Sequence, residues 1–135
     1  MDGSSARKQL FELSRKRETL RQNLMSFRNP MVEGSLVERP VTCGKKGCRC
    51  RKGKPHGPFV YLVRKREGRS VWSYLGKASQ GPLAEAVRRH QRFAALVQEY
   101  RGLCREEEAC LQALEEALTV DAASLSKRIK TEVEK

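Results

Sequence analysis

The sequence of 135 residues lacks long apolar runs, and only 6% of its residues are aromatic. No stretch approaches the roughly 18 consecutive apolar residues of a membrane-spanning helix, so no membrane partner is predicted. The first residues carry no apolar segment either, and we therefore predict no signal peptide. We expect a cytoplasmic protein, with association with the nucleoid as an alternative.

The sequence also lacks the pattern of a disulfide-bonded protein. Its five cysteines are an odd number, and three of them crowd into residues 43–50. Such an arrangement is a poor disulfide framework and suits a reducing compartment.

Motifs of the common enzyme classes are absent as well. The sequence contains no P-loop, no GxSxG and no candidate triad, and its middle part has almost no acids. Paired-carboxylate chemistry and acid-coordinated magnesium are therefore not expected there. We predict that the protein is not an enzyme, with a zinc-dependent nuclease as a remote alternative.

Positive charge is abundant and unevenly placed. The formal net charge is +12; residues 39–92 hold fifteen Lys/Arg and two acids, or +13, and the rest hold thirteen and fourteen, or −1. A charge run is often only a solvated face. Here it coincides with clustered cysteines and aromatic residues, which favours a polyanion-binding surface.

Residues 5–28 are predicted to form a helix. Apolar residues recur at three- and four-residue steps, which places them on one face, with Arg17 at one position of that face. The members of this stripe are Leu10, Leu13, Leu20, Leu24 and Phe27. Asn29-Pro30 ends the helix, because a residue before proline disfavours the helical conformation.

The middle region, residues 31–80, is predicted to be a basic zinc-binding β-hairpin region. A polar connector over residues 31–40 leads to two strands rich in β-branched and aromatic residues, within residues 59–74. Arg66-Glu67-Gly68-Arg69 supplies the turn, where Gly68 can take a positive φ.

Residues 82–118 are predicted to form a long helix, with an apolar stripe that includes Leu111 and Leu118. Its expected partner is the first helix, packed antiparallel as a coil, or the same helix of a second copy. Residues 119–135 are predicted to be a flexible tail, either a short frayed helix or a disordered segment. The predicted fold class is α+β and mostly helical: two long helices in an antiparallel coil with a small zinc-stabilised β hairpin at one end.

The stretch CGKKGCRCRKGKPHGP, residues 43–58, offers four candidate metal ligands: Cys43, Cys48, Cys50 and His56. Zinc prefers four tetrahedral thiolate and imidazole ligands. Neighbouring Lys and Arg lower thiol pKa values and so favour thiolates. We predict a structural Zn²⁺ site; unliganded cysteines and a redox thiol centre are the alternatives.

Basic residues around this motif and on the hairpin are predicted to contact phosphates, and three aromatic residues could stack on bases of a single strand. The predicted phosphate contacts are Lys45, Lys46, Arg49, Arg51, Lys52, Lys54, Arg64, Lys65, Arg66 and Arg69, and the predicted stacking residues are Tyr61, Trp72 and Tyr74.

GSLVERPVTCGKKGCRC followed by KPHGPFVYLVRK resembles a family of short uncharacterised bacterial and archaeal proteins often found beside transposase or integrase genes. The matching positions are Gly34, Ser35, Leu36, Arg39, Cys43, Gly44, Lys45, Cys48, Arg49, Cys50, His56, Gly57, Pro58 and Phe59. The resemblance, over residues 34–118, implies the hairpin, the metal site and the long helix, but no activity. A second stretch, with Leu75-Gly76-Lys77, Leu83 and Ala86, is similar to the small DNA-binding module of some tyrosine recombinases.

Together these features predict a zinc-containing accessory protein that binds nucleic acid, DNA ahead of RNA, with a mobile element as its setting. The alternative is a coiled-coil adaptor that docks a transposase or recombinase, or self-associates, without recognising nucleic acid.

Overall fold

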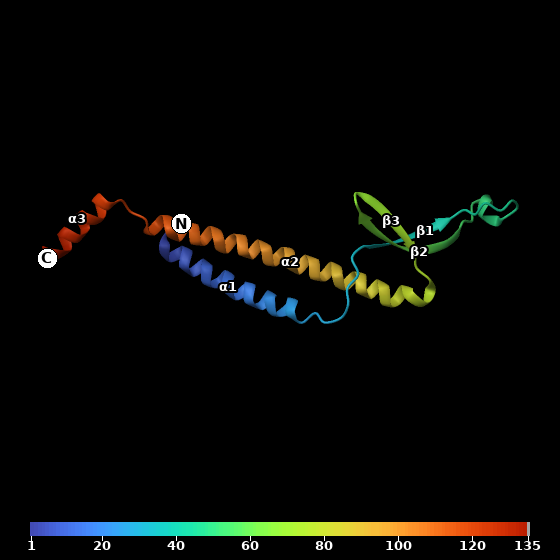
Figure 1. The fold of residues 1–135 in the computed structure, drawn as a ribbon, viewed down its shortest axis with the longest axis horizontal. Coiled ribbons are helices and arrows are strands. Elements are labelled where there is room, and N and C mark those ends of the chain that lie inside the picture. The colour runs from blue at the N-terminus through green and yellow to red at the C-terminus, as the bar shows by residue number, and fades with distance from the viewer. Residues whose placement is uncertain (135) are drawn as a thin grey trace. The chain divides into compact units, whose positions relative to one another are not determined.

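The computed structural model describes residues 1–134, apart from the side chain of Arg51. This part of the chain is an α+β fold with more helix than strand, as predicted (Figure 1). Its elements in chain order are α1 (Gly3–Met25), β1 (Ser35–Val41), the short 3-10 helix η1 (Arg49–Lys52), β2 (His56–Arg66), β3 (Arg69–Tyr74), α2 (Lys77–Leu118) and α3 (Ala122–Val133).

The chain divides into two compact units. The sheet unit is Phe27–Ala95, and the helical unit combines Met1–Ser26 with Leu96–Lys135. The long helix α2 contributes its first half to the sheet unit and its second half to the helical unit.

The sheet unit contains a three-stranded antiparallel sheet in the order β1-β2-β3, where the sequence predicted a two-stranded hairpin. The additional strand, β1, occupies much of the predicted polar connector. Its pairing with β2 joins Leu36 to Leu62 and shifts register between Arg39 and Val41, on either side of Pro40. A proline next to an irregularity of an edge strand removes no regular ladder bond, which explains why this polar, proline-containing segment still forms a strand.

The turn between β2 and β3 agrees with the sequence prediction. Arg66 pairs with Arg69, and both intervening residues have positive φ, 53° at Glu67 and 77° at Gly68. Two positive φ angles suit the right-handed twist of a tight hairpin, and Gly68 adopts its angle without strain. The turn therefore sets the register in which β3 pairs with β2.

One face of the sheet packs against the first half of α2. Three residues are buried together: Leu62 of β2, Leu75 between β3 and α2, and Val87 of α2. Partly buried apolar residues surround them. The surrounding residues are Val32, Leu36, Val60 and Leu83. Alternation along β2 and β1 places Val60, Leu62 and Leu36 on this same face. The core of the sheet unit is thus on one face of the sheet only.

In the helical unit, α1 buries Ala6, Leu13 and Leu20, three positions spaced by seven residues. In the second half of α2 Cys110 is buried, with 2% of its surface exposed, whereas Leu111 is 52% exposed. The prediction that Leu111 and Leu118 belong to the buried stripe was wrong, since Leu118 is also exposed. Adjacent helix positions differ by about 100° in direction, so a stripe that runs through Cys110 leaves Leu111 outside it.

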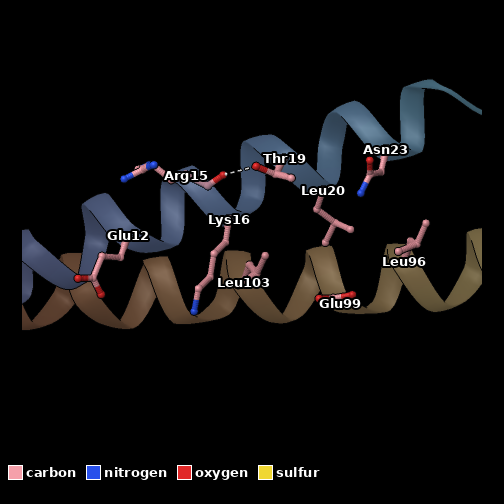
Figure 2. Close-up of a pocket in the computed structure, with 9 residues that line it drawn as sticks. All are labelled: Glu12, Arg15, Lys16, Thr19, Leu20, Asn23, Leu96, Glu99 and Leu103. Atoms are coloured by element: carbon pink, nitrogen blue, oxygen red, sulfur yellow. Dashed lines mark hydrogen bonds between the residues drawn. The ribbon is translucent and has the colours of Figure 1, made fainter.

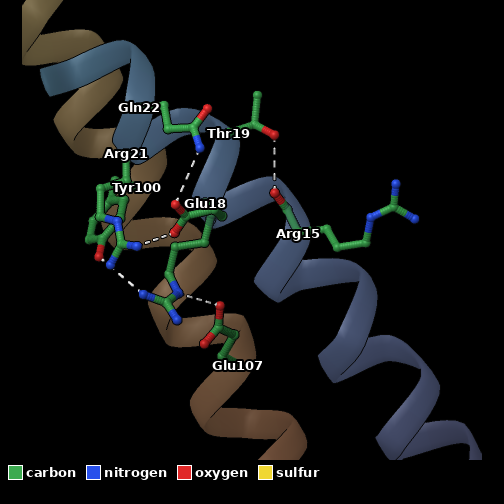
Figure 3. Close-up of polar contacts among 8 residues, drawn as sticks. Arg15, Glu18, Thr19, Arg21, Gln22, Tyr100 and Glu107 are labelled. Atoms are coloured by element: carbon green, nitrogen blue, oxygen red, sulfur yellow. Dashed lines mark hydrogen bonds and ion pairs between the residues drawn. The ribbon is translucent and has the colours of Figure 1, made fainter. Parts of the chain in front are cut away.

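Several contacts join α1 to the second half of α2. Arg17 donates from Nε to Glu107 at 2.7 Å and from Nη1 to the Tyr100 hydroxyl at 3.3 Å. Figure 3 shows Tyr100 and Glu107 on α2 within this network. Near the start of α1, a Cβ on Gly3 would lie 3.7 Å from Leu114 Cδ1. The side chain of Arg17 is therefore held against α2 by hydrogen bonds.

The C-terminal segment, predicted as a flexible tail, contains α3. The Asp121 carboxylate caps it by accepting from Ser124 N at 2.7 Å, and this backbone hydrogen bond lowers the pKa of Asp121. Helix α3 buries none of its residues. Lys135 lies outside the described residues. Among residues 1–134, no helix combines the length and apolar character needed to cross a membrane.

Candidate metal centre

The four predicted ligands lie on the segment that joins β1 to β2. Cys43 follows the end of β1, Cys48 is the residue before η1, Cys50 lies within η1, and His56 begins β2. Gly53 ends η1 in the left-handed conformation, with φ of 88°. That conformation turns the chain back, which brings His56 close to the cysteines that precede it.

The ligand atoms of these four residues all lie within 4.8 Å of one another. Cys43 Sγ and Cys50 Sγ are 3.4 Å apart, and Cys48 Sγ lies 3.1 Å from His56 Nε2. Four ligands held tetrahedrally at zinc-like bond lengths would be separated by about 3.5–3.8 Å. The cluster is therefore compact enough to hold one metal ion.

Burial and hydrogen bonding give the thiols different acidities. Cys50 is 4% exposed, and burial raises the pKa of its thiol. The pKa of Cys48 is lowered to about 7, first by a backbone hydrogen bond from Cys50 and then by the neighbouring thiols. The thiol of Cys48 is thus more readily converted than that of Cys50 to the thiolate that metals bind.

The basic residues beside the cluster are open to solvent. The exposed residues are Lys45, Lys46, Arg49, Lys52 and Lys54. The side chain of Arg51, also predicted to contact phosphate, lies outside the described residues. The loop thus carries five exposed positive charges beside a compact Cys/His cluster.

The predicted hairpin residues separate onto two faces of the sheet. Register and alternation place Lys65 on the same face as Tyr61, Trp72 and Tyr74. Arg64, Arg66 and Arg69 lie on the other face, where Arg64 is partly buried and its Nε has no hydrogen-bond partner. The sheet thus does not present its seven predicted contact residues on one face.

Two residues on the aromatic side of the sheet were missing from the predicted contact residues. Phe59 shares the face of Tyr61, and its ring centroid lies 6.0 Å from that of Tyr74. Arg39 of β1 holds its guanidinium 5.1 Å from the Trp72 ring centroid. Phe59 precedes Tyr61 by two positions, and residues so spaced in a strand share a face, so the sequence could have identified Phe59. Arg39 could not be identified, because the sequence did not predict strand β1.

The helical unit holds a separate groove of about 580 Å³. Figure 2 shows Leu20, Leu96 and Leu103 between the two helices, with polar residues around them. The polar residues are Glu12, Arg15, Lys16, Thr19, Asn23 and Glu99. The groove thus combines an apolar floor of three leucines with side chains of both charges.

These features define a class: a small α+β protein with a basic loop and a Cys₃His cluster that could hold a metal. Residues 8–89, more than half of the chain, match the family described as "Domain of unknown function (DUF6788)". The chain belongs to this family. No curated protein and no solved structure matches it.

Proposed function

We propose that the protein is a nucleic-acid-binding accessory protein, with DNA as the preferred target, whose basic loop is organised by a structural zinc ion. The observation that carries this proposal is the Cys₃His cluster, with all ligand atoms within 4.8 Å, inside a loop that exposes five Lys/Arg side chains. A metal at this position would tie the charged loop to the ends of β1 and β2.

The ligand chemistry supports zinc. Three thiolates and one imidazole form a soft, four-coordinate set of the kind that structural zinc sites use. The four residues would fill a tetrahedron, which leaves no coordination position for a reacting water. We therefore propose a structural role for the metal and a binding role for the protein, not an enzymatic one.

Charge supports a polyanion as the ligand. The whole positive excess, +13, lies within residues 39–92, and the remaining chain carries −1. Phosphates of nucleic acid are the polyanion that such a segment would neutralise, with release of condensed counterions.

The helical unit supports a second function, that of an adaptor. Contacts of Arg17 with Glu107 and Tyr100, and the groove beside Leu20, are consistent with α1 and α2 packing as an antiparallel coil. A transposase, a recombinase or a second copy would dock on this coil, in the mobile-element setting that the sequence resemblance implies.

The test compares two cysteine variants. Wild-type protein purified without chelator is expected to carry about one zinc per chain and to bind a fluorescently labelled DNA at low salt. Cys48→Ser removes one ligand and should lower both the zinc content, measured by elemental analysis, and the affinity, measured by fluorescence anisotropy. Zinc at full stoichiometry in Cys48→Ser would contradict the site.

Cys104→Ser is the matched control, because Cys104 lies in α2, outside the cluster. It should keep both metal and binding. Zinc-loaded wild type that binds neither DNA nor RNA at low salt would contradict nucleic-acid binding and favour the adaptor.

A further inference from the structure

Aromatic side chains gather on the face of the sheet opposite its core. This aromatic face consists of Arg39, Phe59, Tyr61, Trp72 and Tyr74, which the register of β1, β2 and β3 places on one side. The apolar residues of the core, Leu36, Val60 and Leu62, occupy the other side. The aromatic face therefore does not serve the packing of the sheet on α2.

The rings form a connected set. The ring centroid of Tyr61 lies 5.9 Å from the centroids of both Trp72 and Tyr74, and the ring centroid of Phe59 lies 6.0 Å from that of Tyr74. All three pairs have edge-to-face geometry. Edge-to-face contact holds each ring in place while it leaves part of the ring surface uncovered. Trp72 remains 44% exposed and Tyr74 58% exposed. Large aromatic side chains exposed together are uncommon on a soluble surface that has no ligand.

Charge on this face has a single sign. The Arg39 guanidinium lies over Trp72, and Lys65 follows Val63 on the same side of β2. In β1, β2 and β3, all of whose residues the structure describes, the single acid is Glu38, and alternation places it on the opposite face. The face thus offers rings for stacking and cations for phosphates, with no acid to repel them.

We propose that the aromatic face binds a single strand of nucleic acid, whose bases stack on Trp72 and Tyr74 while Arg39 and Lys65 meet its phosphates. Bases of a duplex have their flat surfaces covered by neighbouring base pairs, so only an unpaired strand can offer them to a ring. This inference rests on the proposed function, and it specifies strandedness and the contact surface.

The test uses full-length, zinc-loaded protein and three ligands: oligo(dT), a duplex of the same length, and heparin. Trp72 is the single tryptophan of the chain, so its intrinsic fluorescence reports on this face alone. Oligo(dT) should quench it because bases stack on the indole. Heparin, a polyanion without bases, should leave it nearly unchanged even where it binds.

Affinity for labelled oligo(dT) separates stacking from charge. Trp72→Ala and Tyr74→Ala should each weaken binding by roughly 5- to 150-fold, the range of one base–aromatic contact. Tyr74→Phe keeps the ring and should bind like the wild type, which assigns the effect of Tyr74→Ala to the ring and not to the hydroxyl. Val71→Ala is the matched control, because Val71 is exposed on the same strand but lies on the opposite face.

Three results are decisive. Quenching by oligo(dT), with loss of affinity in the two ring deletions and not in the controls, supports the inference. Equal affinity for duplex and oligo(dT), with Tyr74→Ala indistinguishable from Val71→Ala, overturns it and leaves the proposed function intact. Failure of the zinc-loaded wild type to bind any nucleic acid, DNA or RNA, overturns both.

Discussion

One glycine, next to the start of β1, allows the backbone to pass very close to residues of β2. Gly34, just before β1, has φ of 143°, and a Cβ there would lie 2.8 Å from Leu62 Cδ1 and 2.9 Å from the Val63 carbonyl oxygen. Real Cβ atoms do not approach other atoms so closely, and this backbone conformation strains any residue that carries a side chain. The glycine therefore lets β1 begin directly over the buried Leu62.

At this scale we predict that Gly34→Ala destabilises the protein by about 1–3 kcal/mol. The measurement is the midpoint of urea unfolding. Gly102→Ala is the control, because a Cβ at Gly102 within α2 would meet only the end of the flexible Arg105 side chain, at 3.9 Å. It should be neutral or stabilise the helix by up to about 1 kcal/mol. Equal midpoints for Gly34→Ala and the wild type would contradict the close approach.

On the scale of elements, the two long helices differ in how clearly their buried sides follow from the sequence. In α1 the leucines Leu13 and Leu20 are both predicted and buried. In α2 the small residue Cys110 is buried while the larger Leu111 is exposed. Residue size and apolarity alone favour Leu111, so only the position of a neighbouring helix distinguishes the two.

This difference predicts opposite results for two matched substitutions. Leu20→Asp places a carboxylate at a position that is 6% exposed and should cost at least about 2–5 kcal/mol, the usual cost of deleting a buried leucine side chain. Leu111→Asp places it at a position that is 52% exposed and should be tolerated. Thermal unfolding followed by the helical circular dichroism signal measures both. A wild-type midpoint for Leu20→Asp, or a large loss for Leu111→Asp, would contradict the buried side assigned to each helix.

At the scale of the whole molecule, charge separates along the sequence. The segment 39–92 carries +13, and the rest of the chain is nearly neutral. A ligand that neutralises this segment releases counterions, so its affinity must fall as salt rises.

We therefore predict that the logarithm of the nucleic-acid affinity falls linearly with the logarithm of salt concentration. Replacing Lys45, Arg49 and Lys52 together by Ala should reduce that slope by roughly 2 to 3, since each phosphate contact contributes about 0.7 to 0.9. The control removes three charges from α3 instead, by replacing Lys127, Arg128 and Lys130. Equal slopes for the two triple variants would show that net charge, and not the basic loop, determines binding.

Several features were accessible from the sequence because they depend on neighbours along the chain. The candidate ligands Cys43, Cys48, Cys50 and His56 lie within fourteen residues, so a few turns suffice to bring their ligand atoms within 4.8 Å of one another. The hairpin turn at Glu67-Gly68 is likewise local, because glycine tolerates the positive φ that the turn requires. Binding of zinc by this cluster and of nucleic acid by the protein are predictions.

Other features depended on residues distant in sequence, and only the tertiary structure decided them. Strand β1 exists because its backbone pairs with β2, although its own composition is polar and includes Pro40. That pairing, together with the pairing of β2 and β3, places Arg39 beside Trp72, which lies far from it in the sequence. The sequence by itself determined the candidate ligand set, the segment of positive charge and the turn, since these rest on local geometry and residue type. The faces of the sheet and the buried side of α2 came from the tertiary structure, because a face is defined only by the partner that covers it.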